Sequence, residues 1–474
     1  MVLTNIIPKN KNGDQGTAVT NRQLRRLSSE SGSDTLSAIG RKCAKLVETT
    51  YRNNLDSDYT EQIAALSKAF KYSENSDRLW SEPTHSLLYG TPLYEEATEQ
   101  QKLALNHLSW FANYNYISNS ETETVMYNQV TGSVFDATGY KTLAKELSFE
   151  TEQEYDHIKA FRKVGLMSAT ALIGRQGLNA LLKWNSYKMT LGKRKLPTAQ
   201  YYCLRAVANK MAGSADGKTI NRSEYLRSLE DSNPFILKAP TAGMLGRSIG
   251  DSLPWQSFYA FNWGTGSPFM ACQFYTIRMI ANLYLKNMEH AIAKFARSLE
   301  SSHQPVPAPT AISRYHFLDE AFHTTISRLL ARDLYKEFSA PTAYEKLVAN
   351  SIILKMQRGT LGGLSAVLPH RYFADDYTIF ELLYQLLRSP VFGFSDSDAK
   401  RWMAVCLCEE HDGLHTAAAN KQRLLKELKD FFADVSYLRP VNRQMAAMAK
   451  RSAVDAALAQ NRRTLKRFWQ ERVS

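Results

Sequence analysis

Residues 314–323 read RYHFLDEAFH, and this stretch decides the fold. His316, Glu320 and His323 follow one another in it at steps of four and three residues. On an α-helix these steps place the three side chains on one face, over about two turns. The chain has only ten histidines in 474 residues. Two imidazoles with a carboxylate between them on one helical stripe therefore indicate a candidate metal site.

The Glu-x-x-His spacing occurs twice, as Glu154–His157 in EYDH and as Glu320–His323 in EAFH. Side chains three residues apart on a helix can bind the same ion. Both copies lie in segments whose apolar residues recur at helical steps. Two such copies on two helices favour a metal site far more than a single copy would.

A carboxylate on a neighbouring antiparallel helix would complete each pair. It would lie roughly 30–35 residues earlier, the length of two half-helices at about 1.5 Å per residue plus a turn. Glu289 lies 31 residues before Glu320 and shares a face with apolar residues. Glu121 lies 33 residues before Glu154, and Glu123 lies 31 residues before it. We favour Glu121, which continues an apolar stripe, and keep Glu123 as the alternative ligand.

Two helices that each carry a Glu-x-x-His and two that each carry a single Glu are the pattern of ferritin-like di-metal bundles. Four carboxylates balance the charge of two ferrous ions, and neutral imidazoles complete the coordination. Mixed oxygen and nitrogen ligands suit iron, with manganese as the alternative. The sequence therefore predicts an all-α fold, a ferritin-like di-metal helical bundle with additional N- and C-terminal helices.

Two further carboxylates flank the pairs. Asp319 directly precedes Glu320 and is a candidate acceptor for the second nitrogen of a ligating imidazole. Glu150 lies four residues before Glu154, as His316 lies four before Glu320, and is a candidate for a similar supporting role. An exposed, solvated carboxylate is the alternative interpretation of each.

Helical periodicity runs through most of the chain, and strand-like alternation is scarce. We predict a mobile N-terminal tail, an N-terminal helical extension, the di-metal bundle and a C-terminal helical extension packed on the bundle. These four parts are residues 1–35, 36–94, 95–340 and 341–474. Helical segments are predicted over about 36–72, 95–134, 140–172, 269–300, 310–338, 342–357, 374–388, 396–434 and 439–472, with an irregular middle over 213–268.

A second group of candidate ligands, EEHDGLH at 409–415, is the weaker hypothesis. His411 and His415 are four residues apart, but the Glu that lies between the histidines of the HExxH protease motif is missing. The five cysteines are scattered and have no zinc-site spacing, which favours reduced thiols over a disulfide framework.

The net charge of +13 points to an acidic partner. Nucleic acid is not expected, because no helix-turn-helix, zinc-finger or RNP-type motif appears. An acidic protein would be drawn to this surface by long-range steering. No apolar run approaches the roughly 18–20 residues of a membrane span, so we expect a soluble, cytoplasmic protein without a membrane partner.

The assembled residues resemble the p-aminobenzoate N-oxygenase family of ferritin-like di-iron proteins. That family adds a third histidine four residues before the last Glu-x-x-His, and His316 holds this position in H-x-x-x-E-x-x-H. The resemblance covers about residues 95–340 and implies seven metal ligands. They are Glu121, Glu154, His157, Glu289, His316, Glu320 and His323.

In length the chain is more similar to the cyanobacterial dimetal-carboxylate halogenases of the cylindrocyclophane type. Those enzymes chlorinate unactivated carbons of fatty acyl chains carried on acyl carrier protein in natural-product biosynthesis. The resemblance implies an O2-activating, non-haem dinuclear iron enzyme with an external electron donor, chloride and an acidic acyl carrier protein. An aliphatic hydroxylase would look the same. The alternatives are an arylamine N-oxygenase and a non-enzymatic helical metal-binding protein, and a homodimer is compatible with each.

Overall fold

The computed structural model of the chain describes residues 37–191, 203–204, 206–207, 210, 263 and 266–473. Every regular element in these residues is a helix, and no strand occurs among them, which confirms the all-α prediction. The tail predicted at 1–35 and nearly all of the irregular middle predicted at 213–268 lie outside the described residues. Residues 36–474 form one compact unit. The part boundaries at residues 94 and 340 stay predictions.

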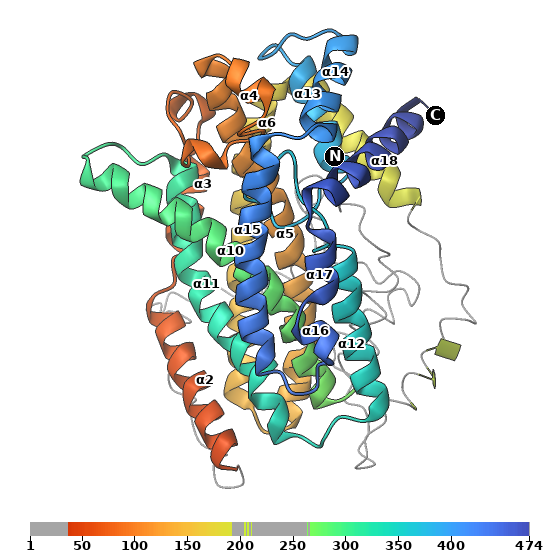
Figure 1. Cartoon of the computed structure of the whole chain (residues 1–474). Coiled ribbons are helices and arrows are strands. Elements are labelled where there is room, and N and C mark those ends of the chain that lie inside the picture. The colour runs from red at the N-terminus through yellow and green to blue at the C-terminus, as the bar shows by residue number, and fades with distance from the viewer. Residues whose placement is uncertain are drawn as a thin grey trace. The chain divides into compact units, whose positions relative to one another are not determined.

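Four long helices form the centre of this unit (Figure 1). They are α5 (Glu99–Ala137), α6 (Lys141–Leu191), α10 (Pro268–Ser301) and α11 (Ala308–Arg332). The most extensive contacts are those between α5 and α6 and between α10 and α11, and the two pairs also touch each other. Each pair is joined by a short connection, which makes its two helices antiparallel neighbours.

Helix α5 is buried along most of its 39 residues, because other helices surround it. A capping box starts it: the Thr98 hydroxyl accepts from the Gln101 N–H, and the Gln101 side chain accepts from the Thr98 N–H. Several of its buried hydroxyls donate to the carbonyl four residues earlier, as Ser118 does to Tyr114 and Thr131 to Tyr127. These hydroxyls can therefore face the protein interior with their donors paired.

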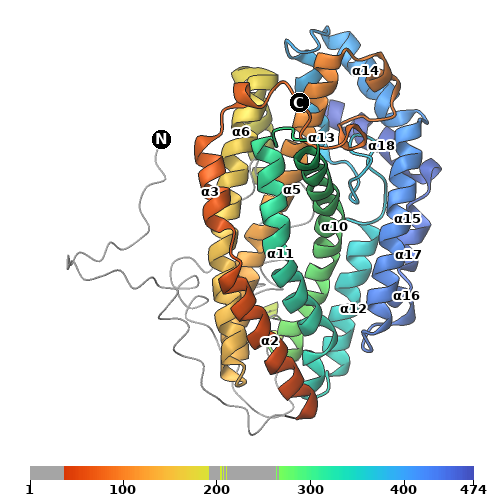
Figure 2. The ribbon, with the colours of Figure 1, turned by 90° about the vertical axis from the view of Figure 1, so that its left-hand side faces the viewer.

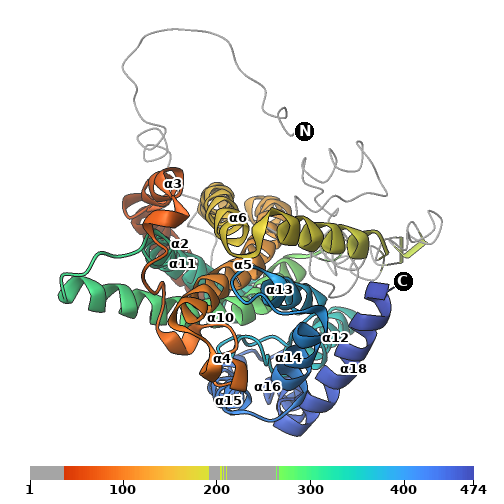
Figure 3. The same cartoon turned by 90° about the horizontal axis from the view of Figure 1, so that it is seen from above.

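Helix α6 is kinked at Gly174, whose φ of 73° lies in the left-handed region that glycine tolerates best. The predicted helix at 140–172 corresponds to the straight part before this kink. The part beyond the kink packs against α13 (Tyr377–Arg388), as Figure 3 shows.

The remaining helices cover the two sides of the central four (Figure 2). On one side α2 (Ala38–Asp56) and α3 (Thr60–Ala69) pack on α6 and α11. On the other side α12 (Ala343–Arg358) and α15 (Asp412–Ala433) contact α10. The shorter elements are α4 (Pro92–Glu96), α14 (Asp396–Cys408), α16 (Pro440–Arg443), α17 (Ala446–Arg451), α18 (Val454–Val473) and the 3-10 turns Tyr72–Glu74, Pro83–His85 and Leu334–Glu337.

Several predicted helical ranges differ from the structure. The range 36–72 is divided between α2 and α3, the range 439–472 is divided among α16, α17 and α18, and α6 runs past residue 172 to Leu191. The range 310–338 was too long, because α11 ends at Arg332 and a 3-10 turn follows it. The range 396–434 is interrupted at 409–411, where α14 ends and His411 caps α15. No helix in the described ranges combines the length and the apolar character that crossing a membrane requires. The cytoplasmic location stays a prediction.

A close contact between two glycines links the start of α4 to the start of α15. The Gly413 N–H donates to the Gly90 carbonyl over 3.1 Å. Gly90 has a φ of 75°, and a Cβ at this position would lie 2.6 Å from the Gly413 nitrogen. Only glycine satisfies both the backbone conformation and the space.

We therefore expect Gly90→Ala to lower the free energy of unfolding by roughly 1–3 kcal/mol from strain at positive φ, and further through the clash. Gly139→Ala is the matched control, because Gly139 has a φ of 93° but no neighbouring atom within 4 Å of its Cβ position. Thermal unfolding followed by circular dichroism measures both variants. An equal loss of unfolding free energy in the two variants would contradict the role assigned to the contact between Gly90 and Gly413.

Candidate metal centre

A buried cluster of carboxylates and imidazoles lies among the four long helices. None of its members is more than 6% exposed. Its members are Glu121 on α5, Glu150, Glu154 and His157 on α6, Arg278 and Glu289 on α10, and His316, Asp319, Glu320 and His323 on α11. Burying so many charges is costly unless they are paired or bind cations.

Four of the residues offer ligand atoms that converge on one point. Glu121, Glu154, His157 and His316 each contribute one atom, all within 4.8 Å of one another. The His316 Nε2 lies 2.9 Å from Glu121 Oε1, and the His157 Nδ1 lies 3.5 Å from Glu154 Oε2. None of these four atoms makes a hydrogen bond. Buried polar atoms without hydrogen bonds are rare, so this first donor group fits a metal ion.

The second nitrogen of each imidazole in this group faces a carboxylate. The His157 Nε2 lies 3.2 Å from Asp319 Oδ2, and the His316 Nδ1 lies 2.7 Å from Glu289 Oε1. Each of these nitrogens must carry the proton, because a carboxylate only accepts. The opposite nitrogen, Nδ1 of His157 and Nε2 of His316, is then free of hydrogen and available as a ligand, the arrangement usual for metal-binding histidines.

Glu289, a predicted ligand, uses one oxygen to hold His316 in place. The same Oε1 also accepts from the Tyr114 hydroxyl over 2.5 Å. Its other oxygen, Oε2, is buried and makes no hydrogen bond. Glu289 can therefore orient His316 through one oxygen and offer the other to an ion.

A second donor group lies beside the first and shares Glu154 with it. It consists of Glu150, Glu154 and His323. The His323 Nδ1 lies 3.5 Å from Glu154 Oε1 and 2.8 Å from Glu320 Oε1. That Glu320 oxygen also lies 3.7 Å from His316 Nε2, between the two groups. Two carboxylates, Glu154 and Glu320, thus stand where each can face two ions.

The structure excludes the alternative in which the two flanking carboxylates are solvated. Asp319 and Glu150 are both fully buried. Glu150 lies in the second donor group, 4.0 Å from His323 Nδ1 through its Oε1. Of the two candidates on α5, the structure brings Glu121 into a donor group, whereas Glu123 is half-buried and belongs to neither group.

Arg278 is a buried cation that the sequence analysis missed. Its Nη2 forms an ion pair with Glu150 and lies 3.4 Å from Glu154 Oε1. Burial lowers its pKa, but the charges of Glu150, Glu320 and Glu154 outweigh burial and raise it, so the guanidinium stays charged. Arg278 lies eleven residues before Glu289, which is three helical turns on the same face of α10. This helical spacing from Glu289 could have identified Arg278 in the sequence.

Gln153 is the counterpart of Asp319 and was also missed. Its Oε1 lies 3.0 Å from His323 Nε2, so the amide oxygen fixes the proton on that nitrogen. Its amide group in turn donates to Asn54 Oδ1 on α2 over 3.0 Å. Gln153 precedes Glu154 as Asp319 precedes Glu320, and this repeat could have revealed it.

The cluster's own charges favour a cation. Burial raises the pKa of Glu121 to about 7, and the charge of Glu154 adds to the rise. Burial lowers the pKa of His323, but the charges of Glu150 and Glu320 outweigh it and raise the pKa to about 10. The carboxylates therefore draw protons onto the imidazoles, and a metal ion would take the place of those protons.

The histidines of 409–415 lie apart from the cluster. The His411 Nε2 is 2.8 Å from the Cys406 carbonyl oxygen, and the His415 Nε2 is 2.8 Å from Glu410 Oε1. Neither histidine belongs to a donor group found among the described residues.

Protein purified without oxygen and loaded with ferrous iron is expected to hold about two irons per chain, one for each donor group. His316→Ala removes a ligand atom of the first group, so iron content should fall towards one, measured by elemental analysis. His290→Ala is the control, because His290 is the exposed neighbour of Glu289 and should leave iron content unchanged. Absence of iron in all three proteins would contradict the assignment.

A comparison with protein families identifies the family of the chain. The sequence profile described as "Acyl halogenase CylC-like" matches residues 42–469, a range that includes all four long helices and most of the surrounding ones. The chain therefore belongs to the CylC-like acyl halogenase family, whose name indicates an enzyme that halogenates acyl substrates. No curated protein and no solved structure gives a significant match.

Proposed function

We propose that this CylC-like acyl halogenase binds two iron ions in its carboxylate–histidine cluster and uses O2 to chlorinate an unactivated aliphatic C–H group. The substrate would be a fatty acyl chain on acyl carrier protein. The observation that carries the proposal is the pair of donor groups that share Glu154, in a member of an acyl halogenase family. The sequence pattern of two Glu-x-x-His pairs with a single Glu on each of two other helices, typical of ferritin-like di-iron proteins, supports the proposal as well.

The ligand types support iron over other metals. Carboxylates and imidazoles make up both donor groups, and no thiolate belongs to either group in the described residues. Such mixed oxygen and nitrogen sets suit iron, with manganese as the alternative. Iron bound there would supply the redox chemistry that activates O2 and removes hydrogen from carbon, with electrons from an external donor.

The protein's part is to orient the ligands and to keep the site dry. Asp319, Glu289 and Gln153 each hold the second nitrogen of an imidazole. The Phe161 ring, fully buried, lies 4.9 Å from the His316 ring centroid and 4.4 Å from that of Tyr114. An apolar wall next to the cluster excludes water, which strengthens the electrostatic interactions within the site.

The reaction is tested with iron-loaded enzyme, O2, a reductant, chloride and a medium-chain acyl group on carrier protein. Mass spectrometry should show replacement of one hydrogen by chlorine, recognised by its isotope pattern, and by bromine when bromide replaces chloride. His316→Ala should lose the product, and His290→Ala should retain it. A product that gains only oxygen would show a hydroxylase, and turnover of an arylamine without acyl turnover would show an N-oxygenase.

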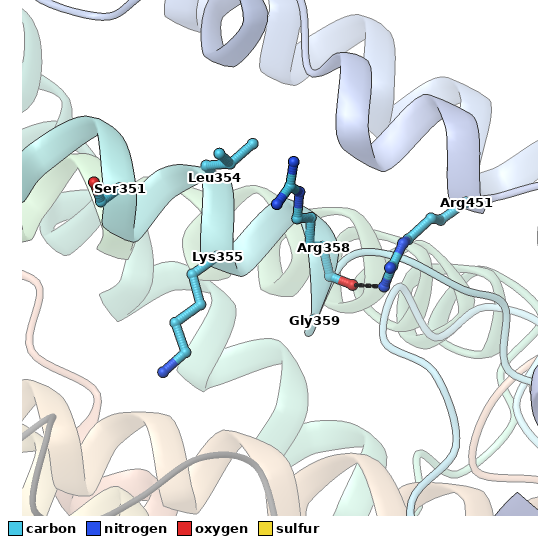
Figure 4. A pocket seen from close by; sticks show the side chains of 6 residues that line it. All are labelled: Ser351, Leu354, Lys355, Arg358, Gly359 and Arg451. Carbon is cyan, nitrogen blue, oxygen red and sulfur yellow. Dashed lines mark hydrogen bonds between the residues drawn. The ribbon is translucent and has the colours of Figure 1, made fainter.

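Positive charge near the C-terminus supports the acidic partner. Between Pro440 and Val473 there are eight basic residues and two acidic ones. Three basic residues, Lys355, Arg358 and Arg451, line an open cleft between α12 and α17 (Figure 4). Arg451 donates to the Arg358 carbonyl over 2.6 Å and so bridges the two helices. Both arginines are exposed and form no ion pair with a carboxylate of the described residues.

The basic surface continues from this cleft onto α18. Gly363, in the turn after α12, lies next to Gln460 on α18. Arg463 and Arg467 follow Gln460 at three and seven residues on the same helical face, and both are exposed. An acyl carrier protein is acidic and carries its acyl chain as a thioester on a pantetheine arm, which a phosphodiester joins to the protein. Both the protein and this phosphate complement these cations.

The double variant Arg358→Glu/Arg451→Glu should raise KM for acyl carrier protein at least tenfold with little change in kcat, because two charges of the docking surface are reversed. KM for a free acyl-pantetheine lacking the phosphate should not change. Lys294→Glu/Arg297→Glu, on an exposed turn of α10, is the control for net charge. An equal rise in KM in the control would show non-specific steering instead of docking at the cleft.

A further inference from the structure

Four aromatic side chains form a continuous line from the metal cluster towards the protein surface. Tyr114 stacks on Trp110 with ring centroids 4.2 Å apart. Trp110 meets Trp80 at 6.3 Å, and Trp80 meets Tyr72 at 6.0 Å, both edge to face. All four are residues that can be oxidised by one electron, unlike phenylalanine. Neighbouring rings in contact allow an electron to pass between them.

The inner end of the line touches the cluster. The Tyr114 hydroxyl donates to Glu289 Oε1 over 2.5 Å, and that oxygen also contacts His316. The Tyr114 ring is fully buried, with its centroid 6.4 Å from that of His316. Tyr114 can therefore give up an electron towards the cluster and its proton to Glu289.

The outer end carries a proton acceptor of its own. Tyr72 is half-buried, and its hydroxyl lies 3.0 Å from His107 Nδ1. The His107 Nε2 lies 2.8 Å from the Arg78 carbonyl, which only accepts, so Nε2 carries the ring proton. Nδ1 is thus the free acceptor for the Tyr72 hydroxyl. An oxidised phenol is a strong acid, and this neutral imidazole suffices to take its proton.

The two indoles between the tyrosines hold their protons. The Trp110 N–H donates to Ser313 Oγ over 2.9 Å, and the Trp80 N–H donates to the Asn75 carbonyl over 2.8 Å. Neither acceptor is a base at neutral pH, so an oxidised indole here keeps its N–H proton. It is then reduced by its neighbour through transfer of an electron alone. A line for electron transfer between tyrosines requires a proton acceptor at each end and none in between. Ordinary aromatic packing does not require such acceptors.

We propose that Tyr72, Trp80, Trp110 and Tyr114 conduct electrons inward and reduce the metal cluster when it has been oxidised by O2 without substrate present. The inference rests on the proposed function. It gives the chain a route by which an unused oxidising equivalent leaves the site before it damages the ligands.

Each transfer moves one electron. Tyr114 gives an electron to the oxidised metal pair and its proton to Glu289. Trp110 then reduces the Tyr114 radical, and Glu289 returns the proton. Trp80 reduces Trp110, and Tyr72 reduces Trp80 while its proton passes to His107 and on to solvent. A thiol in solution finally gives a hydrogen atom to the Tyr72 radical, and two thiyl radicals couple to a disulfide.

The test is to mix iron-loaded enzyme with O2 in the absence of substrate and thiol, and to freeze samples for electron paramagnetic resonance. We expect an organic radical whose signal narrows with ring-deuterated tyrosine, and peptide mass spectrometry should find oxidised Trp80 and Tyr72. In Trp110→Phe, which keeps a stacked ring, oxidation of Trp80 and Tyr72 should fall several-fold at unchanged iron content. Trp402→Phe, a buried tryptophan of α14 outside the line, is the control.

Iron content, O2 uptake and the iron absorption spectrum are recorded on the same samples. If O2 is consumed and the iron is oxidised, but Trp110→Phe shows as much oxidation at Trp80 and Tyr72 as the unchanged enzyme, the electron route is overturned and the proposed function stands. If iron does not bind or does not react with O2, the proposed function fails and the route falls with it.

Discussion

The structure depends on burying seven carboxylates in one small volume between four helices. They are Glu121, Glu146, Glu150, Glu154, Glu289, Asp319 and Glu320. The positive groups buried among them are one guanidinium, that of Arg278, and three imidazoles that carry charge only when protonated. Buried charges without partners are strongly destabilising. Seven carboxylates against one guanidinium leave six excess negative charges, and two divalent cations would offset four of them. Metal binding and the stability of the central helices are therefore expected to be coupled.

Helices α6 and α11 present the same pattern to each other, and this reciprocity builds the site. The matched positions are Glu150 with His316, Gln153 with Asp319, Glu154 with Glu320, and His157 with His323. Asp319 on α11 orients His157 on α6, and Gln153 on α6 orients His323 on α11. The outer helices join the same network, because Asn54 on α2 pairs with Gln153 and the Tyr59 N–H donates to Asp319. The covering helices therefore belong to the site's support.

Spacing along a helix predicts which residues share a face. It sufficed for the all-α fold and for bringing the seven predicted ligands to one cluster, but it missed Arg278 and Gln153. It does not predict which side chain pairs with which across helices. Glu150 could be placed on the face of Glu154, but its burial depends on Arg278 from α10, far away in sequence. Helix ends were also hard to predict, since apolar spacing continues past Arg332 although the backbone turns there into a 3-10 segment.

The separation of charge between core and surface explains why a chain of net charge +13 can be built around an acidic centre. The buried carboxylates count towards that sum, yet they do not face solvent. At long range an approaching partner meets the field of the whole net charge, and bound cations at the cluster would raise that charge further; close to the surface, the nearby exposed cations dominate the field. The exposed arginines of α17 and α18 add local positive charge to this field. An acidic partner is thus attracted by the whole molecule and oriented by the local cations, two effects that ionic strength and point substitution can separate.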